Sequence, residues 1–176
     1  MKTTLIVALS LLLSMPAMAL AQQWGPDAGE WEMTIQGNET SDDSFDNHVF
    51  GIEAALGAYL TRGWLIGARQ GVNYFRTERT GDDESLWNGS TRLFIDYHFG
   101  DRFRPYIGAN VGYIYGDLVT DQWIGGPEAG IKIYLQRKAF LYLSGEYNFF
   151  FESSDDIEDN WDDGRFVYAV GFGLNW

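Results

Sequence analysis

The sequence predicts an all-β fold, an eight-stranded antiparallel up-and-down transmembrane β-barrel. Eight segments alternate apolar and polar residues with a period of two, which is typical of strands that have one apolar face. Short and long connections alternate between these segments. Glycine and aromatic residues are also abundant, with 21 Gly, 7 Trp, 10 Tyr and 12 Phe in 176 residues, and this pairing favours strands over a helical bundle.

The first residues predict an exported chain. Lys2 gives a positive start, residues 5–15 form an apolar run without charge, and Pro16 ends that run. Small residues then allow signal cleavage after Ala19 or Ala21. We favour Ala21, so that 1–21 is a signal peptide and 22–176 is the barrel domain. The apolar run is too short for a membrane-spanning helix, which needs about 20 residues.

The eight expected strands are mostly as long as a tilted strand needs to cross a bilayer, about 9–11 residues. They are 30–39, 48–60, 64–76, 87–99, 104–115, 126–135, 139–150 and 165–176. One face of each is apolar, for example Ile52 and Leu56 in the second strand. The opposite faces carry many glycines and most of the charges that lie within strands.

Alternation alone does not say which face points inward, because a soluble lipocalin-like barrel and a membrane barrel share it. Three features favour the membrane. The connections 61–63, 100–103 and 136–138 are short, whereas 40–47, 77–86, 116–125 and 151–164 are long and polar. The polar face has fewer charges than a soluble surface. Aromatic residues gather at the strand ends, as in two interfacial belts. An even strand count places both termini on the periplasmic side, with the short turns.

Charged residues on the polar face are expected inside the barrel. They are Glu53, Arg69, Arg92, Asp96, Glu128, Lys132 and Glu146. Arg92–Asp96 and Glu128–Lys132 are each four apart on one strand, and Glu53 and Arg69 lie on neighbouring strands. Because buried charges must be paired, we interpret the set as a salt-bridge network that plugs the lumen and fixes the strand register. The alternative is an ion path or gate, although eight strands rarely leave a continuous channel.

The remaining charges polarise the molecule. The formal net charge is −13, with acids concentrated in the long connections and Arg62, Arg102, Arg104, Arg137 and Lys138 in or beside the short turns. This composition argues against nucleic-acid binding, which needs clustered basic residues. The acidic loops are either simply solvated or bind divalent cations weakly, bridging to lipopolysaccharide phosphates. No cofactor and no defined metal site are predicted.

A catalytic site is not expected. The chain has two histidines: His98 falls in the lumen, and His48 lies at the rim near Ser44 and Asp46. These neighbours could in principle form a Ser/His/acid set, but spacing alone is weak evidence. A lipid-modifying enzyme is therefore the least favoured alternative.

Three segments resemble the small outer-membrane β-barrel family that includes the OmpA barrel domain and the OmpX and Ail proteins. They are 104–113 (RPYIGANVGY), 126–132 (GPEAGIK) and the last strand ending in Trp176. The resemblance implies location in a bacterial outer membrane, and an assembly signal at Phe172, Leu174 and Trp176 read by the barrel assembly machinery. It also implies contact with outer-membrane lipids and a possible surface ligand or host protein. We expect a structural or surface-interaction role through the acidic loops, with a narrow channel as the alternative.

Overall fold

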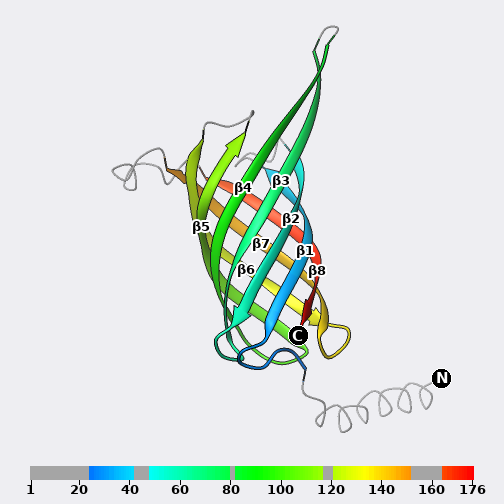
Figure 1. The fold of residues 1–176 in the computed structure, drawn as a ribbon, viewed down its shortest axis with the longest axis vertical. Coiled ribbons are helices and arrows are strands. Elements are labelled where there is room, and N and C mark those ends of the chain that lie inside the picture. The colour runs from blue at the N-terminus through cyan, green and yellow to red at the C-terminus, as the bar shows by residue number, and fades with distance from the viewer. Residues whose placement is uncertain (1–23, 42–47, 80–81, 117–120, 152–163) are drawn as a thin grey trace, which may run out of the picture.

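The computed structural model describes residues 24–41, 48–79, 82–116, 121–151 and 164–176. Its eight strands are β1 (Trp31–Ser41), β2 (His48–Tyr59), β3 (Trp64–Arg79), β4 (Asp82–His98), β5 (Phe103–Gly116), β6 (Gln122–Tyr134), β7 (Ala139–Phe151) and β8 (Arg165–Asn175). Each strand pairs antiparallel with its neighbours in the chain, and β1 pairs with β8 to close the barrel. The predicted fold class is thereby confirmed (Figure 1). The expected signal peptide, residues 1–21, lies outside the described part of the chain.

The closure between β1 and β8 is continued by the last residue. Their ladder runs from Glu32↔Asn175 to Ser41↔Phe166. Beyond it, the Trp31 N–H donates to the Trp176 carbonyl (2.9 Å) and the Trp176 N–H donates to the Trp31 carbonyl (3.0 Å). The backbone of the barrel seam is thus paired to the end of the chain, as a closed barrel requires in lipid.

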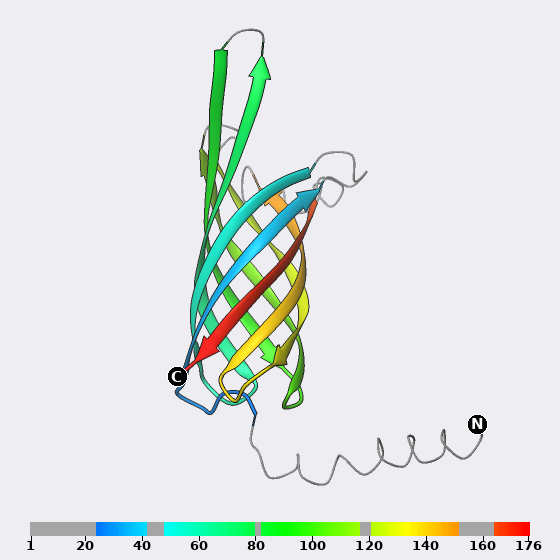
Figure 2. The same cartoon turned by 90° about the vertical axis from the view of Figure 1, so that its right-hand side faces the viewer.

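The strand boundaries agree with the expected ones, except in two connections. The predicted connection 77–86 is wrong over most of its length, because β3 and β4 continue as a ladder to Arg79↔Asp82. Figure 2 shows this hairpin rising beyond the other strands. The connection 116–125 is shorter than expected, because β6 begins at Gln122. The β3–β4 extension is mostly polar, so that it lacks the alternation that identifies a strand with one apolar face. The β6 extension is apolar at Trp123 and Ile124, but it runs into the glycine pair 125–126, a dipeptide typical of turns.

The apolar faces point outward and the polar faces inward. Ile52, Leu93, Val170 and Phe172 are each more than half exposed on the outside. Inside, the polar side chains are buried. This is the arrangement of a membrane barrel, in which lipid replaces the core of a soluble protein. Among the described residues, no helix is long and apolar enough to cross a membrane.

Aromatic side chains gather at both ends of the outer wall. Near the short turns, Trp64 packs on Tyr97, with ring centroids 4.8 Å apart. Near the long connections, Trp87 packs edge-on against Tyr115 (6.2 Å) and Tyr113 against Trp123 (5.6 Å). Two belts at these heights match the aromatic girdles that flank the apolar band of a membrane barrel.

Candidate functional site: a charge network inside the barrel

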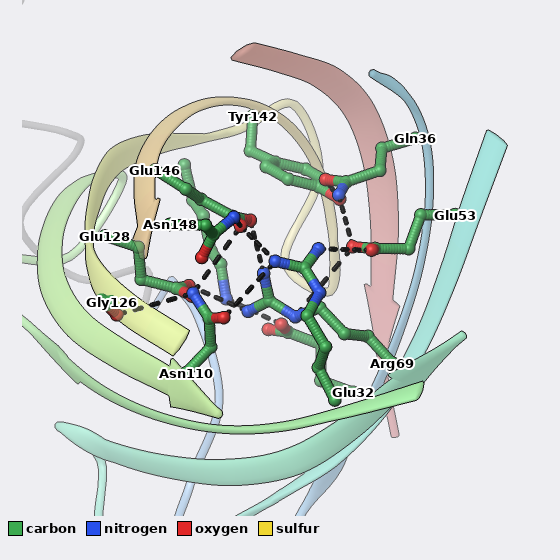
Figure 3. A network of polar contacts seen from close by, with 12 residues as sticks. Glu32, Gln36, Glu53, Arg69, Asn110, Gly126, Glu128, Tyr142, Glu146 and Asn148 are labelled. Atoms are coloured by element: carbon green, nitrogen blue, oxygen red, sulfur yellow. Dashed lines mark hydrogen bonds and ion pairs between the residues drawn. The ribbon is translucent and has the colours of Figure 1, made fainter. Parts of the chain in front are cut away.

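The centre of the lumen is built from two like-charged cross-strand pairs. Arg69 on β3 is directly opposite Arg92 on β4 in the ladder. Glu128 on β6 is directly opposite Glu146 on β7. Like charges in such positions destabilise a sheet by themselves. Here Arg69 faces both acids across the lumen (Figure 3). Arg92 pairs with Glu146 as well, so that the two like-charged pairs compensate each other.

Ion pairs connect the two sides. Arg69 donates through Nη1 to Glu146 Oε1 (2.6 Å) and through Nη2 to Glu128 Oε1 (2.7 Å). Arg92 donates to Glu146 and to Glu53 of β2. The side chains of all five residues are almost completely buried. The network therefore ties β2, β3 and β4 to β6 and β7 through the inside of the barrel.

Neutral side chains complete the hydrogen bonding of the carboxylates. Gln36 donates to Glu53 Oε1 (2.6 Å), and Tyr142 donates to Gln36 in turn. Asn110 donates to Glu128 Oε2 (3.0 Å), and Asn148 donates to Glu146 Oε2 (3.2 Å). Every carboxylate oxygen of Glu53, Glu128 and Glu146 accepts at least one hydrogen bond. This is the condition under which buried charges are tolerated.

A second polar layer lies nearer the short turns. Lys132 Nζ contacts Glu32 Oε1 at 2.6 Å. Glu32 Oε2 accepts from Tyr59 (2.8 Å) and from Asn175 (3.1 Å). The ammonium group also faces aromatic rings, among them Phe140 at 5.1 Å from the ring centroid. Lys132 therefore belongs to a separate cluster and not to the central one.

The structure places all seven of the lumen residues named from the sequence inside the barrel, each buried. It brings five of them together, pairs Lys132 with Glu32 instead, and gives Asp96 no ion pair within the described residues. The same-strand spacings Arg92–Asp96 and Glu128–Lys132 do not correspond to ion pairs. Residues four apart on one strand are roughly 13 Å apart at the usual rise, whereas partners across a narrow lumen are in contact.

Glu32, Gln36, Asn110 and Asn148 are the polar partners that the sequence reasoning missed. Glu32 carried a usable signal, because it lies between Trp31 and Met33, two apolar residues that face outward. Parity alone would have placed it inside.

A small cavity separates the two layers. Its volume is about 20 Å³, which is room for about one water molecule. The lining residues include Glu32, Glu53, Arg69, Asp96 and Lys132. The Oδ1 atom of Asp96 is buried without a hydrogen-bond partner among the described residues. That oxygen lies over Gly108, where a Cβ would be only 2.0 Å away, so a side chain at position 108 would displace Asp96.

The end with the short turns is covered by residues 24–30, an arrangement that the sequence did not predict. Trp24 packs against the buried Tyr134–Phe140–Tyr142 cluster. The guanidinium carbon of Arg102 lies over the Trp24 ring, 4.9 Å from the ring centroid. The Gly25 N–H donates to the Arg137 carbonyl (3.2 Å), and the Gly29 N–H donates to the Tyr59 carbonyl (2.7 Å).

Several of the basic residues expected at this end hold the covering segment. Arg62 donates to the Trp24 carbonyl (3.3 Å) and to Asp101 (3.2 Å). Lys138 pairs with Glu30. Arg104 is fully buried and donates to the carbonyl groups of Gly100 and Arg62.

The residues considered for catalysis are not assembled into a site in the described part of the chain. His98 is buried, stacks on Tyr106 (4.9 Å between ring centroids) and contacts the Gly63 carbonyl. The side chain of His48, and all of Ser44 and Asp46, lie outside the described residues. Within the described ranges, no group of three or more His, Cys, Asp or Glu side chains is arranged to hold a metal ion.

The three residues of the expected assembly signal share one face. Phe172, Leu174 and Trp176 point outward from β8 and the chain end, and each is about half exposed. Between them, Gly173 and Asn175 point into the lumen. A neighbouring protein could therefore reach the three apolar side chains from the membrane.

The chain is similar in sequence to a known family. The family model described as "Outer membrane protein beta-barrel domain" matches residues 5–176. No curated protein matches the chain.

Solved structures show the same fold at low sequence identity. Neisserial surface protein A is 10% identical with a TM-score of 0.56, the match covering 84% of this chain and 96% of that one. OprG of Pseudomonas aeruginosa is 13% identical with a TM-score of 0.55, covering 86% and 98%. Ail of Yersinia pestis is 12% identical with a TM-score of 0.52, covering 85% and 99%.

Proposed function

The chain belongs to the outer membrane protein beta-barrel domain family, and from this premise we propose that it is a plugged barrel that acts through its acidic extracellular connections. The bacterial outer membrane is the location of this family. The observation that carries the proposal is the charge network that crosses the lumen from β3 and β4 to β6 and β7. This network fills the lumen among the described residues, and with the acidic sequence of the long connections it supports a structural or surface-interaction role.

The buried network argues against free passage of solutes. Arg69 and Arg92 each bind carboxylates on two other strands, and the cavity beside them has room for about one water molecule. Eight-stranded barrels generally leave space only for side chains. The alternative role, a narrow ion channel, requires both guanidinium groups to leave their partners.

We propose that the end with the short turns is periplasmic, and that residues 1–21 are a signal peptide removed on export. Support for the orientation comes from the chain ends, since the start of β1 and the end of β8 pair at the same end as the short turns. The long connections then face the cell exterior. We further propose that Phe172, Leu174 and Trp176 form the contact for the barrel assembly machinery, because they present a continuous apolar face to the membrane.

The proposed activity lies in the long connections, whose sequence is strongly acidic. The fourth holds Glu152, Asp155, Asp156, Glu158, Asp159, Asp162 and Asp163. These residues lie outside the described ranges, so that the proposal rests on their charge. Ail of Yersinia pestis has been solved with the heparin analogue sucrose octasulfate, a polyanion. Charge repulsion argues against such a ligand here. Divalent cations that bridge to lipopolysaccharide phosphates, or a cationic surface ligand such as a host protein, suit the charge better.

A pair of loop variants tests this role. One variant lacks residues 155–163, and the other keeps the loop length with each Asp changed to Asn and Glu to Gln. We expect both refolded variants to lose calcium-dependent retention of lipopolysaccharide. Folding should stay unchanged, as measured by the heat-dependent mobility of the barrel on an SDS gel. If the neutralised variant retains lipopolysaccharide as well as the unchanged protein does, the acidic charge is not the binding determinant and the proposal fails.

We propose no enzymatic activity. In support, within the described part of the chain His98 has no serine as a hydrogen-bond partner, and the rings of Tyr59 and Tyr106 contact its imidazole. Nucleophilic catalysis requires a nucleophile within hydrogen-bond reach of the base. A His48→Ala variant that lost a lipid modification would contradict this assignment.

A further inference from the structure

Three hydrogen-bonding side chains lie together on the outer wall of the barrel, where their neighbours are apolar. Gln70 on β3 and Thr91 on β4 are cross-strand partners, and Tyr115 of β5 reaches both. Val72 and Leu93 flank the cluster and are 49% and 62% exposed. Polar groups in the hydrocarbon region are costly unless they are hydrogen-bonded, so such a cluster on this surface requires a reason.

Gly89 makes the cluster possible. It is the ladder partner of Tyr115, and the tyrosine ring lies directly against it, since a Cβ at position 89 would be 2.4 Å from Tyr115 Cε2. The ring therefore passes over β4 and carries its hydroxyl group to Gln70 on β3. A tyrosine at a membrane interface normally keeps its hydroxyl at the wet end. This one is directed to a polar cluster on the wall instead.

The three side chains satisfy one another's donors. The Gln70 amide donates to the Tyr115 hydroxyl oxygen (2.9 Å) and to the Gly71 carbonyl (3.2 Å), and the Thr91 hydroxyl donates to Gln70 Oε1 (2.6 Å). The Tyr115 hydroxyl then has Thr91 Oγ1 as its acceptor (3.4 Å). Each hydroxyl and amide hydrogen of the three side chains therefore already donates a hydrogen bond, whereas the oxygens keep free lone pairs. A ligand that binds here must act as the hydrogen-bond donor.

We propose that Gln70, Thr91 and Tyr115 bind a hydroxyl group on an acyl chain of an outer-leaflet lipid. In the β3–β4 ladder the Gln70–Thr91 pair lies between the Trp64–Tyr97 pair of one aromatic belt and the Tyr74–Trp87 pair of the other, so that the cluster is at the depth of acyl chains, below the headgroups. The exposed Val72 and Leu93 provide apolar contact for the chain beside that hydroxyl. An acyl chain without a hydroxyl has no hydrogen to donate. The inference rests on the outer-membrane location and on the proposed orientation, and not on the proposed role of the loops.

The test compares two esters on the refolded full barrel in detergent micelles. One carries a tetradecanoyl chain with a β-hydroxyl group, and the other is the same ester without the hydroxyl. We expect the hydroxy ester to shift the side-chain amide resonances of Gln70 in a saturable manner, and the plain ester to leave them in place. Tyr115→Phe should weaken the apparent affinity about three- to tenfold, as expected for one hydrogen bond.

Tyr168→Phe is the matched control, because Tyr168 is also exposed on the outer wall, on β8. It should leave the response unchanged. Equal shifts from both esters, or an unchanged affinity in Tyr115→Phe, would overturn the proposal. A shift that follows the concentration of protein instead of ester would also overturn it, because a second copy of the chain would then occupy the cluster. The comparison of the two esters on the unchanged protein stands even if a variant does not fold.

Discussion

Replacement of Arg69 by methionine should destabilise the barrel more than any comparable change at its rim. Methionine keeps much of the packing volume but removes the ion pairs to Glu128 and Glu146 at 2.7 and 2.6 Å. These two acids are directly opposite each other in the ladder, so the change leaves a buried like-charged pair that faces only Arg92. Breaking a buried pair by removing one partner costs about 3–5 kcal/mol, and we expect a loss of that size in the free energy of unfolding.

The measurement is a reversible urea titration of the protein in lipid vesicles, followed by tryptophan fluorescence. Arg62→Met is the matched control, because Arg62 pairs with Asp101 at 3.2 Å but both side chains are largely exposed. Exposed pairs contribute about 0–1 kcal/mol. A second change, Glu128→Gln in the Arg69→Met background, should recover part of the loss by removing one of the two facing charges. If Arg69→Met costs no more than Arg62→Met, the charge network is not what holds the two sides of the lumen together.

Three further predictions concern substitutions of Gly112, Trp24 and Trp176. Gly112→Ala should prevent or strongly slow folding, because a Cβ there would be 2.1 Å from the Thr91 carbonyl oxygen. A Cβ at position 37 would have nothing within 4 Å. Gly37→Ala should therefore fold normally, as measured by the heat-dependent mobility of the folded barrel on an SDS gel. Trp24→Ala should expose residues 24–30 to proteolysis and speed amide exchange of Gly25, because Trp24 packs on the Tyr134–Phe140–Tyr142 cluster at the short-turn end. An unchanged exchange rate would show that this contact does not hold the segment. Trp176→Ala should slow assembly in cells while refolding in vesicles stays normal, and equal defects in both would argue for a purely structural role.

The strands were predictable because lipid and lumen impose opposite demands on alternate residues. Ile52 and Glu53 are neighbours in sequence, yet one is 68% exposed and the other 2%. That contrast is a property of each short segment, so the sequence contains it locally. Residues 77–86 are almost all polar in sequence, so that no alternation of apolar and polar residues marks the upper part of the β3–β4 hairpin, and the sequence predicts a loop there.

The identity of the inward charges was predictable from the same parity, but their partners were not. Arg69 binds Glu146, which is 77 residues away in the chain, and only barrel closure brings them together. The cover formed by residues 24–30 follows no periodicity at all, since it depends on side chains from several turns. The hydroxyl of Tyr115 reaches Gln70 only because Gly89 leaves room for the ring, and this relation spans three strands.

The electrical conductance of the refolded barrel in a planar bilayer tests the central claim most directly. A lumen filled by the contacts of Arg69 and Arg92 with Glu53, Glu128 and Glu146 should show no steady ohmic conductance. A steady conductance in the unchanged protein, altered by Arg92→Met or Lys132→Met, would contradict the plugged barrel and establish a channel instead.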